Sequence, residues 1–108
     1  MKYELLPSEK PGLYRIRALR DFGGVRAGDI GGYVESESNL SHDGDAWVHG
    51  GARVYDDARV SGNAHVAGNA RVSGNARISG NVWVFGDARV SGNARISDNA
   101  QVYGYAQV

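Results

Sequence analysis

Apolar residues recur at every sixth position from Ala46 to Val108. One column of β-branched residues contains Val48, Val54, Val60, Val66, Val72, Ile78, Val84, Val90, Ile96, Val102 and Val108. A second column, two residues earlier, contains Ala46, Ala52, Ala58, Ala64, Ala70, Ala76, Val82, Ala88, Ala94, Ala100 and Ala106. The residue between the columns is usually polar, so each hexad predicts a short strand with two side chains inward and one outward. A helix is excluded, because a period of six rotates the apolar positions around a turn of about 3.6 residues.

Turn residues separate these predicted strands. Glycine occupies one corner position, at Gly62, Gly68, Gly74, Gly80, Gly86, Gly92 and Gly104. Asparagine usually follows it, and both residue types tolerate the positive φ that a sharp corner requires. Strands and corners at a fixed period predict a β-solenoid. Bulky outward residues align at a spacing of 18, as Trp47, His65 and Trp83 do, which favours three hexads per coil and a triangular cross-section.

The first 29 residues lack the hexad. Within them, residues 13–19 alternate in polarity and predict a strand. We expect residues 1–29 to cap the first coil, because an open solenoid end is an unpaired edge. Residues 30–108 then form the β-helix, and both parts belong to one domain.

The start of the coiled region is less regular than the rest. Residues 30–34 are predicted to form an irregular hexad in phase with the later ones. In the same phase Leu40 falls in the alanine column. His42 falls in the valine column, and we expect its side chain to point inward.

The repeat resembles that of a known family. The run Val-Ser-Gly-Asn-Ala-Arg at residues 72–77 is similar to the hexapeptide repeat of left-handed parallel β-helix proteins, and the resemblance covers residues 46–108. It implies an all-β fold with a left-handed coil. The preceding segment, from residues 13–19 through Gly31-Gly32-Tyr33 to Asn39-Leu40-Ser41, resembles that of small prophage-encoded members of the transferase-hexapeptide superfamily. This resemblance implies that the protein is located in the cytoplasm of a bacterial host. Glycine stands one position later than in the transferase repeat, as in Val72-Ser73-Gly74, and this departure argues against acyltransferase activity.

Composition narrows the function classes. The chain has 12 Lys and Arg against 12 Asp and Glu, so its net charge is zero, which disfavours a strongly basic nucleic-acid binder and an acidic DNA mimic. It has no cysteine, which rules out a disulfide scaffold, a thiolate metal site and a cysteine nucleophile. Neither a signal peptide nor a membrane-spanning apolar run is evident, so we expect a soluble cytoplasmic protein without membrane association.

Acyl transfer with a histidine base is the first enzymatic activity to consider. Hexapeptide acyltransferases, which the fold resembles, need a histidine base and a groove for an acyl carrier, and His65 is the candidate base. The alternative places His65 on the surface, stacked between Trp47 and Trp83. The three histidines, at 42, 49 and 65, are not spaced as in the zinc carbonic anhydrases of this fold. We therefore expect no catalytic residue, no metal and no cofactor.

Arginine forms two columns at the spacing of 18. The first column contains Arg53, Arg71 and Arg89, with Gln107 following, and the second contains Arg59, Arg77 and Arg95. They are candidates for binding anions such as phosphates, nucleic acid or an acidic protein. The alternative is that they keep the sheet faces soluble and block edge pairing.

Aromatic and histidine side chains gather on the remaining face. The predicted partner-binding residues are Trp47, His49, His65, Trp83, Phe85, Tyr103 and Tyr105. Two exposed tryptophans on a small solenoid are unusual, and aromatic residues anchor protein interfaces. The alternative is a stacked ladder that only stabilises the coils.

These observations favour a non-enzymatic, self-associating β-solenoid interaction protein. The chain stops inside a predicted strand at Val108, so we expect another subunit to cover the last coil, as a homodimer through the C-terminal coils or as a trimer. The prophage resemblance implies a host protein or a nucleic-acid-processing defence complex as a partner, with inhibition as the outcome. The alternatives are a hexapeptide-type acyltransferase and a sponge that binds small anions or nucleotides.

Overall fold

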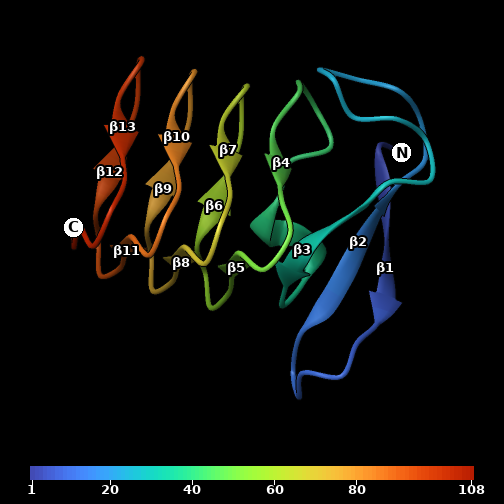
Figure 1. Ribbon diagram of the computed structural model, residues 1–108, viewed down its shortest axis with the longest axis horizontal. Helices are drawn as coiled ribbons and strands as arrows, with labels where there is room; N and C mark the ends of the chain where they lie inside the picture. The colour runs from blue at the N-terminus through green and yellow to red at the C-terminus, as the bar shows by residue number, and fades with distance from the viewer.

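The computed structural model describes residues 1–108 as an all-β chain whose coils stack side by side along one axis (Figure 1). Residues 18 apart pair in parallel register, as Arg53 with Arg71 and Arg71 with Arg89. Successive strands fall in turn on three different sheets. The predicted β-solenoid, with three strands to each coil of about 18 residues, is therefore confirmed.

Each sheet is one wall of the solenoid. The six-stranded sheet has the order β1 (Tyr3–Pro7), β2 (Tyr14–Ala18), β3 (Ile30–Val34), β5 (Arg53–Val54), β8 (Arg71–Val72) and β11 (Arg89–Val90). The four-stranded sheet contains β4 (Trp47–Val48), β7 (His65–Val66), β10 (Trp83–Val84) and β13 (Gln101–Val102). The three-stranded sheet contains β6 (Arg59–Val60), β9 (Arg77–Ile78) and β12 (Arg95–Ile96). The single helical turn is η1 (Glu37–Asn39).

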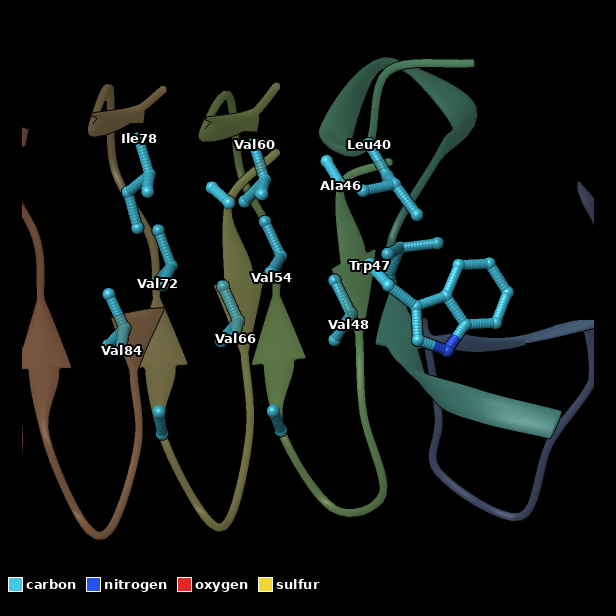
Figure 2. Close-up of a cluster of buried hydrophobic side chains, with 14 of the residues drawn as sticks. Leu40, Ala46, Trp47, Val48, Val54, Val60, Val66, Val72, Ile78 and Val84 are labelled. Atoms are coloured by element: carbon cyan, nitrogen blue, oxygen red, sulfur yellow. The ribbon is translucent and has the colours of Figure 1, made fainter. Parts of the chain in front are cut away.

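The two apolar columns fill the interior. Val48, Val66 and Val84 lie in a row along the solenoid axis in Figure 2, and all three are fully buried. The alanine column is also fully buried from Ala46 to Ala88. Burial declines in residues 91–108, where Val108 is 51% exposed.

The corners are stabilised by backbone geometry and by side-chain ladders. Gly74 adopts a φ of 65°, a conformation that residues with a side chain rarely adopt. Asn63 donates to Asn81 at 3.3 Å, and Asn81 donates to Asn99 at 3.2 Å, so amide side chains bridge three successive coils.

The N-terminal segment extends one wall of the solenoid and covers its first coil. Strands β1 and β2 form an antiparallel hairpin, and β2 pairs antiparallel with β3. Strand β3 then pairs in parallel with β5, which joins the hairpin to the coils. The predicted strand at residues 13–19 is therefore present as β2.

The predicted phase of residues 30–42 is wrong. Val34 pairs with Val54, and Leu40 with Val60, each at a spacing of 20, whereas Trp47 pairs with His65 at a spacing of 18. The corner after Leu40 thus holds two additional residues. Leu40, not His42, takes the valine position, and Val34 rather than Ile30 points inward.

His42 consequently lies in this enlarged corner and not in the interior. Its ring stacks on Tyr3 with centroids 4.0 Å apart, and its Nδ1 accepts the backbone N–H of Lys2 at 3.2 Å. The additional residues therefore attach the N-terminal segment to the first coil.

Candidate binding surfaces

The four-stranded sheet aligns the predicted aromatic column. Trp47, His65 and Trp83 are direct neighbours on β4, β7 and β10, as the spacing of 18 predicts. Their exposure differs sharply, because Trp47 is 2% exposed and Trp83 is 42% exposed. The expectation of two exposed tryptophans is therefore wrong for Trp47.

Trp47 is covered by the chain's own N-terminal segment. In Figure 2 its indole points away from the valine column and toward that segment. Phe22 meets it edge-on with centroids 5.3 Å apart, and Tyr3 does so at 6.3 Å. Trp47 thus belongs to the core, and its side chain is not available to a partner.

Two histidines and a tryptophan stack on the same sheet. The ring of His65 lies 4.2 Å from that of Trp83, and its Nδ1 is 2.9 Å from Nε2 of His49. Burial lowers the pKa of both histidines below the usual value of 6.5, and the proximity of His65 lowers the pKa of His49 further. The strand of His65 therefore lies between those of the two tryptophans, as predicted, but its ring stacks on Trp83 and His49 and not on Trp47.

Phe85 and Tyr103 continue this surface at the adjoining corner. Their rings stack with centroids 5.4 Å apart, and Tyr103 is 59% exposed. Together with Trp83 they form what we call the aromatic patch. Tyr105 is 84% exposed but lies around the corner, where it lines a groove with Arg71 and Arg89.

The two arginine columns occupy the two other walls. Arg53, Arg71 and Arg89 are register partners on the six-stranded sheet, and a bridge joins Gln107 to Arg89. The second column, Arg59, Arg77 and Arg95, is in register on the three-stranded sheet. None of the six guanidinium groups makes a hydrogen bond or an ion pair within the chain, since the two ion pairs join Arg17 to Glu4 and His42 to Glu37.

The surroundings of the two columns differ in charge. Asp87 lines the same groove as Arg71 and Arg89, and Glu35 and Asp56 line the groove that contains Arg53. Acidic side chains therefore lie close to the first column. The groove beside Arg59 and Arg77 contains one carboxylate, that of Glu37.

The structure also separates the three histidines. His42 hydrogen-bonds Glu37 at 2.9 Å in the enlarged corner, whereas His49 and His65 lie together on the four-stranded sheet. No three histidine, aspartate, glutamate or cysteine side chains are grouped so that they could hold a metal ion.

The helical content is limited to one short turn, and no helix has the length and apolarity to cross a membrane.

Comparison with known proteins identifies the repeat. The model of the YdcK β-solenoid repeat matches residues 52–68, 67–80, 70–86, 88–104 and 94–108. The matches together span more than half of the chain. No curated protein matches the chain.

Proposed function

This chain belongs to the YdcK β-solenoid repeat family, and from its fold and surface we propose that it is a non-enzymatic interaction protein that binds other proteins through the aromatic patch. Trp83 carries the proposal, because its indole is 42% exposed yet held in place by the stack on His65. Tryptophan and tyrosine supply most of the energy at many interfaces. An indole already fixed in one orientation loses little conformational entropy on binding.

The proposed partners are a second copy of the chain and a protein of the host cell. Tyr103 lies on the C-terminal coil, so pairing through the patch brings the C-terminal coils of two copies together. The resemblance to prophage-encoded proteins favours a host assembly that processes nucleic acid, with binding that blocks its action.

Light scattering tests self-association. We expect the average mass of the wild-type protein to rise with concentration, and the double variant Trp83→Ala/Tyr103→Ala to remain monomeric over the same range. Tyr14→Ala is the matched control, because Tyr14 is 44% exposed and lies on the N-terminal hairpin. A wild-type protein that is monomeric at every concentration would remove self-association from the proposal.

Affinity capture from the native host tests the foreign partner. We expect the wild-type protein and Tyr14→Ala to retain the same host protein, and Trp83→Ala to lose it. The purified partner should then bind the wild-type chain at least tenfold more tightly than Trp83→Ala, the loss that a central interface anchor typically produces. Equal affinity for both chains would contradict the assignment to the aromatic patch.

Acyl transfer is the second candidate, and one observation favours it. Burial lowers the pKa of His65 and so favours its neutral form, which a general base requires. Neither His65 nor His49 lines any groove, however, so a substrate-sized cleft is not built around the pair. Incubation with an acyl-CoA and candidate acceptors distinguishes the two functions. Acyl transfer by the wild-type protein that disappears in His65→Ala would show that the protein is an enzyme and would contradict the non-enzymatic proposal.

A further inference from the structure

A groove of about 550 Å³ opens on the wall formed by the three-stranded sheet. Arg59 and Ser61 lie on one coil of this wall, and Arg77 and Ser79 lie on the next. Each serine follows its arginine by two positions, so the two side chains of a coil point to the same outer side. Two guanidinium groups and two hydroxyl groups therefore face one groove.

The irregular first coil forms one side of the groove. The lining includes Glu37 of η1 together with Ser41 and His42 of the enlarged corner. The carboxylate of Glu37 is hydrogen-bonded to Nε2 of His42 at 2.9 Å. The only acidic group that lines the groove thus already has a hydrogen-bond partner in His42.

Neither arginine forms an ion pair within the chain. Arg59 and Arg77 are register partners on adjacent strands, which places them about 4.8 Å apart along the wall. Like charges that face each other across a strand pair repel. Because neither arginine has a hydrogen-bond or ion-pair partner in the chain, their donors are free to bind an anion that relieves this repulsion.

We propose that this groove binds the phosphate group of a small phosphorylated ligand. The planar guanidinium fork matches phosphate oxygens, and charge-assisted hydrogen bonds of this kind are short and strong. The hydroxyl of Ser61 has only a 3.5 Å contact to the carbonyl of Ile78, so it is available to donate to a further phosphate oxygen. The volume of the groove exceeds that of one phosphate, which leaves room for the organic part of the ligand.

The choice of this wall over the first arginine column follows from charge. Arg71 and Arg89 share their groove with the carboxylate of Asp87, which competes with a bound anion for the guanidinium groups. The groove at Arg59 and Arg77 is lined by one carboxylate, that of Glu37, which is already hydrogen-bonded to His42. The site also shares no residue with the aromatic patch, so it does not depend on the proposed protein interaction.

Calorimetric titration with inorganic phosphate and with glycerol 3-phosphate tests the site, with sodium chloride holding the ionic strength constant. We expect saturable binding to the wild-type protein, weakened at least tenfold in Arg59→Gln/Arg77→Gln. The matched control Arg71→Gln/Arg89→Gln removes the same two charges from register partners on another wall and should change the affinity less than twofold. Equal losses in both variants, or no saturable binding to the wild-type protein, would overturn the proposal.

A second measurement locates the site without any substitution. In the wild-type protein, phosphate should shift the backbone amide NMR signals of Ser61 and Ser79 and leave those of Ser73 and Ser91 unchanged. The latter two serines follow Arg71 and Arg89 at the same two-residue spacing, so they are internal controls. Shifts confined to Ser73 and Ser91, or spread evenly over all arginine-bearing coils, would contradict the assignment.

Discussion

Lys2 is a buried cation that joins the N-terminal segment to the first coil. Its side chain is fully buried, and Nζ donates to the carbonyl oxygens of Ala46 at 2.7 Å and Gly44 at 3.4 Å. Burial, with a further contribution from Arg20, lowers the pKa of Lys2 from 10.5 to about 8. Asp45 and Asp43 oppose this shift. A charged lysine is therefore disfavoured in the folded state relative to the unfolded chain.

The stability of the protein should consequently increase with pH in the alkaline range. Folded Lys2 loses its proton near pH 8 and unfolded Lys2 near pH 10.5, so between these values the unfolded chain holds more protons and a rise in pH favours folding. Tyr3 acts in the opposite sense above pH 10, because burial raises its pKa above the usual value of 10.0. We expect the melting temperature to rise from pH 7.5 to 9.5 in the wild-type protein and to stay level in Lys2→Met. The same pH dependence in both chains would contradict this role of Lys2.

At the scale of the elements, the corner glycines set how closely the coils approach. A Cβ atom added to Gly74 would lie 2.8 Å from the backbone nitrogen of Gly92 in the next coil. Asp56 is a non-glycine residue in the preceding corner of the same column, with a φ of 57°, and its carboxylate accepts the backbone N–H of Gly74 at 3.2 Å. A side chain is thus tolerated in this column where it forms a compensating hydrogen bond.

Gly74 and Gly92 form a matched pair for measuring this effect. Their φ angles are 65° and 64°, but nothing lies within 4 Å of a Cβ atom added to Gly92. Gly92→Ala should cost about 1–2 kcal/mol, for the left-handed conformation alone. Gly74→Ala should cost about 1–3 kcal/mol more, because the added methyl group forces the coils apart. Urea denaturation of both variants checks the order, and equal losses would show that the coils separate freely.

The repeat made the walls predictable, because each position on a wall recurs in several successive coils along the chain. The alignment of Trp47, His65 and Trp83 and the register of both arginine columns followed from a spacing of 18. The left-handed sense of the coil was expected only from the resemblance to hexapeptide-repeat proteins. Features that occur once were not predictable in the same way.

The enlarged corner is the clearest of these single features. Leu40 is apolar and fits the alanine column as well as the valine column, so the hexad alone did not reveal the two additional residues. Their effects include the position of His42 and one side of the proposed phosphate-binding groove. The burial of Trp47 was also not predictable, because it depends on the packing of Tyr3 and Phe22 from the non-repeating N-terminal segment.

The molecule as a whole measures 31 × 29 × 21 Å, and its three walls differ in chemistry. The four-stranded sheet presents the stacked histidines and Trp83. On the six-stranded sheet acidic residues line the same grooves as the arginines, whereas on the three-stranded sheet Arg59 and Arg77 share a groove with serines. A solenoid allows this division because the outward residue of each strand affects the interior little, so each wall can change its chemistry independently.

The proposed protein-binding and phosphate-binding sites should therefore behave as independent sites. Trp83→Ala should weaken self-association and leave phosphate affinity unchanged, whereas Arg59→Gln/Arg77→Gln should do the reverse. The triple variant Trp83→Ala/Arg59→Gln/Arg77→Gln combines both changes. Its free energies of self-association and of phosphate binding should each equal the sum of the separate effects to within about 0.5 kcal/mol, as is usual for distant sites without shared partners. Light scattering and calorimetry on the same four proteins measure both properties. A phosphate affinity that falls in Trp83→Ala would instead mean that the walls are coupled, either through the shared interior or because phosphate binds only to the associated form.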